Sequence, residues 1–239
     1  KELSEKKVDS VIELFSNGKT SEALDSIELL IKDHPNESLL FNIRGACYAG
    51  LNQPEEAIKN YKDALAIKPD YSDASYNLGN VLKSLGHLEE AVKSYKKTIA
   101  IEPNYHAAQL NLGVTLQELG LFNDAAEQYE EALNIKPDNI EAQINLGFVY
   151  QSLGQLEEAV EQYESILSTN PENVEVLNNL GIIYRELGHV DEAISYYKKV
   201  LEIDPGFTGA YYNLGFIYQD LGQVNNSIEQ YEKAISISD

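Results

Sequence analysis

Apolar residues recur along this chain at the spacing of amphipathic helices, and glycine and proline separate the helical segments. Residues 73–85 show the pattern clearly, because five apolar side chains there fall on one face of a helix. These are Ala74, Leu78, Val81, Leu82 and Leu85. Gly86 is expected to end this helix, because glycine accepts the left-handed backbone that a helix end often needs.

A second helix is predicted to begin near Leu88. Its apolar face comprises Ala91, Val92, Tyr95, Thr98 and Ile99. Pro103 closes the segment, since proline inside a helix removes a hydrogen bond and clashes with the preceding turn. The sequence therefore predicts two helices that pack against each other, with small residues such as Gly79 and Ala91 letting the backbones approach closely.

This helix pair is repeated along the chain with a period of 34 residues. The prolines that share the spacing are Pro35, Pro69, Pro103, Pro137, Pro171 and Pro205. One glycine series is Gly45, Gly79, Gly113, Gly147, Gly181 and Gly215, and a second runs from Gly18 to Gly222 with Asn52 in one place. The tyrosine series is Tyr61, Tyr95, Tyr129, Tyr163, Tyr197 and Tyr231, with Ile27 in the first unit.

A helix–turn–helix unit of 34 residues with this pattern resembles the tetratricopeptide repeat, from about residue 4 to the end of the chain. The resemblance implies an all-α solenoid, a right-handed superhelix of about seven repeats forming a single domain over residues 1–239. The expected repeats are 4–37, 38–71, 72–105, 106–139, 140–173, 174–207 and 208–239. Val11 stands where the first repeat should have its glycine, so this repeat is expected to act as a cap.

An asparagine precedes Leu-Gly in the first helix of five repeats. The five are Asn77, Asn111, Asn145, Asn179 and Asn213. Turning 100° per residue places each of them on the flank of the helix face opposite the core. A side-chain amide offers one acceptor and two donors, which suits the backbone of an extended peptide. The series is similar to the asparagine ladder of O-linked N-acetylglucosamine transferase, and that resemblance implies that the five amides bind peptide backbone.

A structural alternative accounts for the same asparagines. Each amide could bond to a neighbouring repeat and fix the stacking of the array, because buried amides usually find partners inside the protein. The sequence leaves these two interpretations open.

Apolar side chains lie opposite the core in the first helices of repeats four to seven. They are Leu110, Val114, Ile144, Phe148, Ile182, Tyr212 and Phe216. A helix that is apolar on both faces is expected to be covered on both. The sequence therefore predicts an apolar strip beside the asparagines, used by a partner, by a second copy or by packing within the array. From the third repeat onward the only basic residues on this stripe are Lys83 and Arg185, which lie too far apart to form one carboxylate clamp.

The net charge of −21 makes nucleic acid and anionic membranes poor partners. Residues 1–105 carry 13 Lys+Arg and 17 Asp+Glu, whereas residues 106–239 carry 5 and 22. An extended or basic protein or peptide is the expected partner. No apolar run is long enough to insert into a membrane, and a cytoplasmic location is expected unless an N-terminal signal has been removed.

No residues are arranged for catalysis, so we expect no enzymatic activity, no cofactor and no metal. The four histidines lack metal-ligand spacing. The single cysteine, Cys47, has no evident activating base and is expected to be buried.

Three functions remain open from the sequence. The first is a non-catalytic scaffold that binds an extended polypeptide in the concave groove. The second is the substrate-recognition domain of a larger transferase, because similar repeats precede glycosyltransferase and sulfotransferase domains and this chain lacks methionine, as an excised piece would. The third is self-association through the C-terminal repeat, whose last apolar face is expected to be uncovered.

Overall fold

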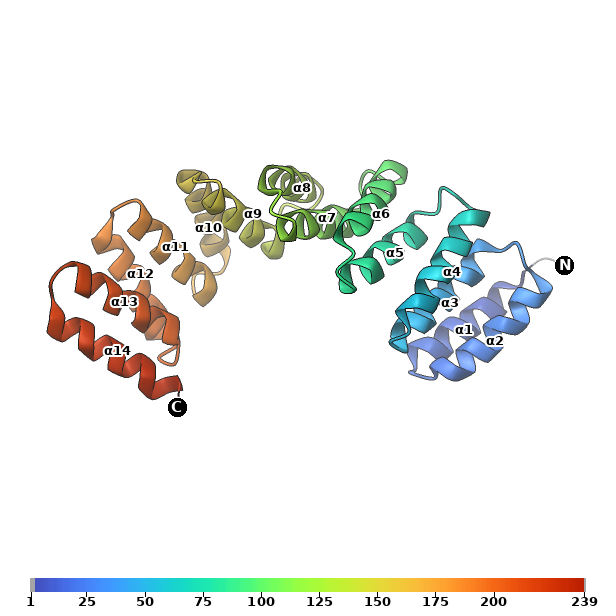
Figure 1. Cartoon of the computed structure of the whole chain (residues 1–239), viewed down its shortest axis with the longest axis horizontal. Coiled ribbons are helices and arrows are strands. Elements are labelled where there is room, and N and C mark those ends of the chain that lie inside the picture. The colour runs from blue at the N-terminus through green and yellow to red at the C-terminus, as the bar shows by residue number, and fades with distance from the viewer. Residues whose placement is uncertain (1–2, 239) are drawn as a thin grey trace. The chain divides into compact units, whose positions relative to one another are not determined.

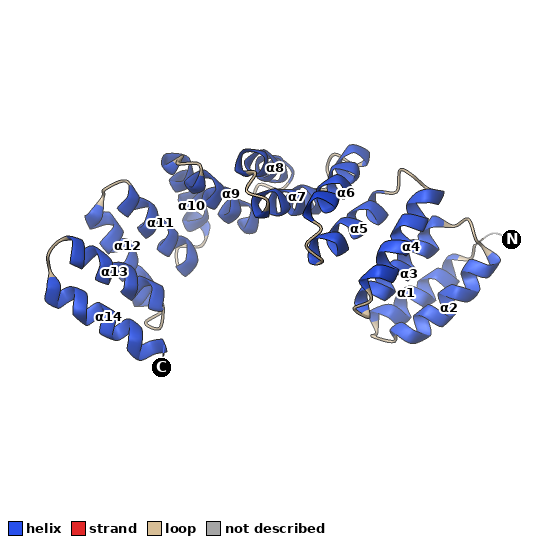
Figure 2. Cartoon of the chain, in the orientation of Figure 1, coloured by secondary structure: helices blue, strands red, loops and turns tan. Residues whose placement is uncertain are grey.

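The computed structural model of the chain describes residues 3–238, apart from the side chain of Ser238. Helices and short turns account for these residues, and no strand occurs among them (Figure 2). Each expected repeat is a pair of helices that pack side by side, which confirms the all-α repeat predicted from the sequence (Figure 1).

The chain divides into two compact units between Ile135 and Lys136, in the turn that follows the eighth helix. Unit 1 comprises the first four repeats and unit 2 the last three. The helices of unit 1 are α1 (Glu5–Ser16), α2 (Thr20–Asp33), α3 (Ser38–Gly50), α4 (Pro54–Ile67), α5 (Ser72–Ser84), α6 (Leu88–Ile101), α7 (His106–Glu118) and α8 (Phe122–Ile135). The helices of unit 2 are α9 (Ile140–Ser152), α10 (Leu156–Thr169), α11 (Val174–Glu186), α12 (Val190–Ile203), α13 (Thr208–Asp220) and α14 (Val224–Ser238).

A tyrosine ring packed on a glycine joins the two helices of six repeats. A Cβ atom added to Gly79 would lie 2.7 Å from Cε1 of Tyr95, which is closer than such atoms can approach. The same distance is 2.6–2.7 Å in the other five pairs, from Gly45 with Tyr61 to Gly215 with Tyr231. The glycine and tyrosine series therefore share one period, because each tyrosine ring occupies the space that a side chain in place of the glycine would need.

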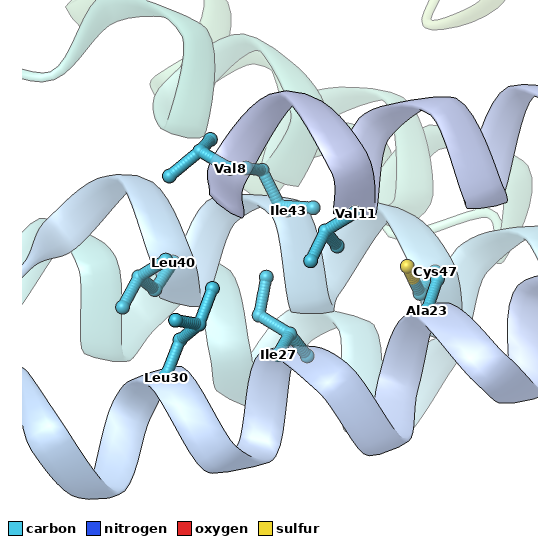
Figure 3. Close-up of a cluster of buried hydrophobic side chains, with 8 residues drawn as sticks. All are labelled: Val8, Val11, Ala23, Ile27, Leu30, Leu40, Ile43 and Cys47. Carbon is cyan, nitrogen blue, oxygen red and sulfur yellow. The ribbon is translucent and has the colours of Figure 1, made fainter. Parts of the chain in front are cut away.

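The first repeat replaces this pair with Val11 and Ile27. Both side chains are buried, at 2% and 0% exposure, and they belong to one apolar cluster with Leu30, Leu40 and Cys47 (Figure 3). Val11 is larger than the glycine of the other repeats, and Ile27 is smaller than their tyrosine. The space between the two helices therefore stays filled. Burial raises the pKa of the Cys47 thiol, which keeps it protonated as expected for a packing residue.

Within each unit, neighbouring repeats are joined by apolar layers built from the second helix of one repeat and the first helix of the next. One layer in unit 2 combines Tyr163 and Ile166 of α10 with Val176, Leu180 and Ile183 of α11. Burying one such aliphatic side chain contributes about 1.5–3 kcal/mol. The core of each unit is therefore a row of layers between successive helices.

The turn inside each repeat follows one backbone pattern. At the end of α5 the Gly86 N–H donates to the Lys83 carbonyl and the His87 N–H donates to the Leu82 carbonyl, with Gly86 at φ 76°. Asn52 adopts φ 56° at the equivalent place in the second repeat, since asparagine tolerates this region best after glycine. Glycine ends the helix as predicted.

Among the residues that the structure describes, no helix combines the length and apolar composition needed to cross a bilayer.

Candidate functional site

The first helices of repeats three to seven carry the residues singled out by the sequence. In unit 1 these helices include α5 and α7, with Asn77 and Asn111, and in unit 2 they are α9, α11 and α13, with Asn145, Asn179 and Asn213. All five asparagines are half-buried. We call the exposed side of these helices the first-helix face of each unit.

In unit 1 the asparagine amides bond to the preceding repeat. Asn77 Nδ2 donates to Asn42 Oδ1 at 3.1 Å. Asn111 Nδ2 donates to Asn80 Oδ1 at 2.9 Å and to the Tyr76 hydroxyl at 3.1 Å. Because Asn111 has only two amide hydrogens, both are engaged inside the protein. In this unit the asparagines therefore form hydrogen bonds between neighbouring repeats, as expected if they fix the stacking of the array.

A tyrosine extends this network. The Tyr95 hydroxyl donates to Asn80 Oδ1 at 2.8 Å, so one amide oxygen accepts from both Tyr95 and Asn111. Burial raises the pKa of Tyr95, which keeps the phenol neutral and able to donate. The Tyr76 ring lies 6.0 Å from the Tyr95 ring and 5.0 Å from the Tyr105 ring, measured between centroids. Polar and aromatic groups of unit 1 thus satisfy one another on this face.

The asparagines of unit 2 are held less tightly. Asn179 Nδ2 donates to the Tyr163 hydroxyl at 3.4 Å, and Asn213 Nδ2 donates to Asn178 Oδ1 at 3.5 Å. Both distances exceed the usual range for an N–H···O bond. The Asn145 side chain makes no hydrogen bond to any residue between 3 and 238. The structure therefore leaves amide groups of unit 2 available, whereas it uses those of unit 1.

The predicted apolar strip is exposed mainly in unit 2. Phe148, Tyr212 and Phe216 are 46%, 58% and 38% exposed, and Ile144 and Ile182 are half-buried. The repeat period places Phe148, Ile182 and Phe216 at one position, three residues after the asparagines. A row of apolar side chains therefore runs beside the row of amides.

In unit 1 the strip differs from the prediction. Leu110 is buried, at 8% exposure, and Val114 is half-buried. Helix α7 packs against α5, α6 and α8, and this packing removes Leu110 from solvent. The prediction of an exposed strip is therefore wrong at Leu110.

The sequence places the tyrosines on the apolar face of the second helices, and this pattern does not predict the contacts of their hydroxyls. All the tyrosines of the series except the half-buried Tyr231 are buried, yet several of their hydroxyls reach side chains of the first helices. The Tyr129 hydroxyl donates to Gln117 Oε1 at 2.9 Å, and the Tyr231 hydroxyl donates to Gln219 Oε1 at 3.2 Å. A recurrent glutamine at the twelfth residue of a repeat was the sequence signal for this contact.

Unit 2 also carries a basic residue on this face. Arg185, half-buried on α11, lies with its guanidinium carbon 5.1 Å from the centroid of the Phe216 ring. The other basic residue of the predicted stripe, Lys83, pairs with Glu118 at 3.4 Å. Lys83 lies in unit 1 and Arg185 in unit 2, and each contacts its own neighbours.

The last helix, α14, exposes an apolar row made of Val224, Ile228 and Ile235, which are 62%, 50% and 62% exposed. One repeat earlier, the equivalent residues Val190, Ile194 and Leu201 pack into a cluster with residues of α13. The row on α14 thus consists of positions that another helix covers inside the array.

Family models for the tetratricopeptide repeat match residues 45–86, 79–120, 118–154, 138–205 and 208–239. The chain belongs to the tetratricopeptide repeat family. Its fold is that of a protein-interaction scaffold.

Two curated relatives are peroxisomal targeting signal receptors. The receptor from Kluyveromyces lactis is 35% identical over 72 residues, which are 30% of this chain and 13% of the receptor. The receptor from Saccharomyces cerevisiae is 38% identical over 63 residues, which are 26% of this chain and 10% of the receptor. The similarity thus spans only a small part of these longer proteins.

Solved structures of other repeat proteins are similar over more of the chain. MamA is 27% identical with a TM-score of 0.63, covering 67% of this chain and 94% of MamA. YrrB, described as a repeat protein with an unusual peptide-binding site, is 26% identical with a TM-score of 0.62, covering 74% of this chain and 91% of YrrB. The C-terminal part of a repeat protein from Cytophaga hutchinsonii has a TM-score of 0.81 over 96% of this chain and 94% of its own. At 17% identity, that likeness concerns the fold alone.

The contrast between the two units yields a matched pair of substitutions. Replacing Asn111 with Ala removes two hydrogen bonds and leaves Asn80 with one donor fewer, so it should lower the free energy of unfolding by about 1–2 kcal/mol. Replacing Asn145 with Ala removes no hydrogen bond to another described residue and should change the free energy of unfolding by less than about 0.5 kcal/mol. Urea denaturation of both variants measures the difference. Equal losses would mean that Asn145 also serves stacking.

Proposed function

We propose that this chain is a non-catalytic scaffold that binds an extended polypeptide in the concave groove of the repeat array, with its main contacts on the first-helix face of unit 2. The observation that carries the proposal is the pairing of free or weakly bonded amides with exposed apolar side chains. Asn145 has no hydrogen-bond partner among residues 3–238, and Phe148, one turn further on α9, is 46% exposed.

The two rows support complementary kinds of contact. Amides at Asn145, Asn179 and Asn213 can donate to backbone carbonyls and accept from backbone N–H groups of any sequence. Phe148, Ile182 and Phe216 can cover apolar side chains of the same peptide, and exposed apolar groups of this kind commonly mark interaction sites. Asn77, Asn111, Leu110 and Val114 of unit 1 would contribute less, because their side chains are bonded or covered.

The relatives support a peptide as ligand. YrrB is described as having a peptide-binding site, and the curated relatives are receptors for a targeting signal. The excess of carboxylates in residues 106–239 would favour approach of a basic polypeptide through long-range attraction, which salt would weaken. We therefore propose an extended and predominantly basic partner.

The proposal is tested with a peptide selected from a random display library on the immobilised chain. Replacing both Asn145 and Asn179 with Ala should weaken its binding by about tenfold or more, because two backbone contacts are lost. Isothermal titration calorimetry measures the affinity, and thermal denaturation of the same variant should show little loss of stability.

The matched control is Lys198→Ala together with Lys199→Ala, two exposed residues of the second helix α12. This variant should bind the peptide with unchanged or slightly higher affinity. Loss of affinity in the control but not in the asparagine variant would place the ligand on the second helices and overturn the proposal.

Self-association through the C-terminal repeat is a second candidate, favoured by the exposed row on α14. The internal equivalents of this row pack against a cluster to which α13 contributes Ala210, Leu214 and Ile217. On α1 the residues at these three places are Lys6, Ser10 and Glu13, all exposed. Because α1 is polar there, we propose that a second copy presents its own α14, which gives a closed dimer.

Replacing Ile235 with Glu should abolish such a dimer, because it places a charge in the centre of the contact. The control is Ile237→Glu, since Ile237 is 40% exposed and its internal equivalent Ile203 is also 40% exposed. Sedimentation velocity across a dilution series measures the state. A wild-type chain that stays monomeric at high concentration would remove this candidate.

A further inference from the structure

A cleft of about 400 Å³ opens in unit 2, between helix α12 and the loop that joins α10 to α11. Its apolar wall consists of Leu167 from α10, Leu177 from α11 and Ile203 from α12. Leu177 precedes Asn179 by two residues, which turns it by about 200° around the axis of α11. The cleft therefore lies apart from the row of amides on the first-helix face.

An aromatic ring lines the cleft beside the apolar wall. Tyr196 on α12 is half-buried, and its ring stacks on the Tyr184 ring at 5.3 Å between centroids and 13° between planes. The ammonium of Lys199 lies over the Tyr196 ring, with Nζ 5.2 Å from the centroid. Aromatic rings attract cations through the negative charge of their faces. The free chain thus already holds one of its own cations at this ring.

Two carboxylates also line the cleft. Glu172 lies in the loop after α10 and Glu202 lies near the end of α12, and both are exposed. Neither forms an ion pair with any residue between 3 and 238. The cleft therefore combines an apolar wall, an aromatic ring and unpaired negative charge.

The sixth repeat alone has this combination, although the same positions recur every 34 residues. In place of Tyr196 the other repeats have polar residues, namely Ser26, Asn60, Ser94, Gln128, Gln162 and Gln230. In place of Glu202 they have no carboxylate, but Lys32, Ala66, Ala100, Asn134, Ser168 and Ser236. The stacking of repeats therefore does not require the side chains that form the cleft.

The third repeat shows what these positions do elsewhere. Its residues equivalent to Leu177 and Tyr196 are Ser75 and Ser94, and the Ser75 hydroxyl donates to the Ser94 carbonyl at 2.9 Å. A polar contact inside the repeat is thus replaced, in the sixth repeat, by apolar and aromatic groups that line an open space.

We infer that this cleft binds the side chain of a lysine or arginine from a basic partner polypeptide. The methylene groups of such a side chain pack against the apolar wall, and its charged end lies between the Tyr196 ring and the two carboxylates. A neutral apolar side chain would leave the carboxylates without a partner, and an anion would meet them at close range. The site lies outside the groove and does not rest on the proposed function.

Lys199 competes with the ligand for the Tyr196 ring. Its side chain is exposed, so its ammonium can move into solvent when another cation enters the cleft. The ligand then takes the place of Lys199 on the ring, and the displaced ammonium stays nearby as a like charge. Removing this ammonium should therefore strengthen the binding of a basic side chain.

The test uses three amino acids with both ends blocked, namely N-acetyl-lysine N-methylamide, N-acetyl-arginine N-methylamide and the neutral N-acetyl-norleucine N-methylamide. Nuclear magnetic resonance of the full chain should show saturable shifts of the Leu177 and Ile203 methyl signals with at least one basic probe, at a concentration about fivefold or more below that needed for norleucine. The tighter basic probe names the side chain. Equal half-saturation by all three probes, or no saturable shift with either basic probe, would overturn the inference.

Tyr196→Gln introduces the residue of three other repeats, so it should keep the fold while weakening the basic probe several-fold. The matched control is Tyr211→Gln, which removes another half-buried tyrosine of unit 2 with a lysine over its ring, Lys233 at 6.0 Å. Tyr211 does not line the cleft, so the control should bind normally. Equal affinities of the two variants for the basic probe would contradict a site at Tyr196.

Lys199→Ala and Lys198→Ala each remove one positive charge from exposed neighbours on α12, but only Lys199 lines the cleft. Lys199→Ala should bind the basic probe several-fold more tightly than Lys198→Ala does. Equal affinities of these two variants would mean that only net charge matters, and the site would have to be abandoned. The blocked amino acids report on the cleft alone, so their failure would leave the display-selected peptide as the separate test of the proposed function.

Discussion

The packing of one tyrosine ring on one glycine is the constraint on which the rest of this array depends. The ring leaves no space for a Cβ atom at Gly79, and the same close approach occurs in five further repeats. It fixes the distance between the two helices of a repeat, and so it fixes where the first helix presents its outer side chains. The first repeat uses Val11 and Ile27 for the same purpose, which shows that the filled volume matters more than the particular pair.

The same tyrosines also link the core to the surface. All of them except the half-buried Tyr231 are buried, and four of the six hydroxyls bond to side chains of the first helices, as Tyr95 does with Asn80. In unit 1 Asn111 donates both of its amide hydrogens to Tyr76 and Asn80, so few hydrogen-bonding groups are left for a ligand. Among the residues that the structure describes, unit 2 leaves Asn145 unbonded, Phe148 exposed and the Tyr197 hydroxyl without an acceptor. A difference of a few side chains on one scaffold thus separates a face that stabilises stacking from a face suited to binding.

Most of the fold could be predicted from the sequence, because it follows from local rules repeated many times. The period of 34, the helix end at Gly86 and the second helix from Leu88 all agree with the structure. The candidate site could be predicted only in part. Periodicity placed Asn111 and Asn145 at equivalent positions, but it could not tell that one amide is bonded and the other is not. That difference depends on the side chains that face them from the preceding repeat, such as Asn80. Likewise, the burial of Leu110 depends on the packing of three neighbouring helices.

The central claim is that unit 2 binds a polypeptide through amides that the array does not need for its own stability. The most direct measurement follows the side-chain amide signals of the asparagines by nuclear magnetic resonance while the display-selected peptide is added. The account predicts saturable shifts for Asn145 and Asn179 and unchanged signals for Asn111, whose two amide hydrogens stay on Asn80 and Tyr76. Shifts at Asn111 without shifts at Asn145, or shifts confined to the second helices, would contradict it.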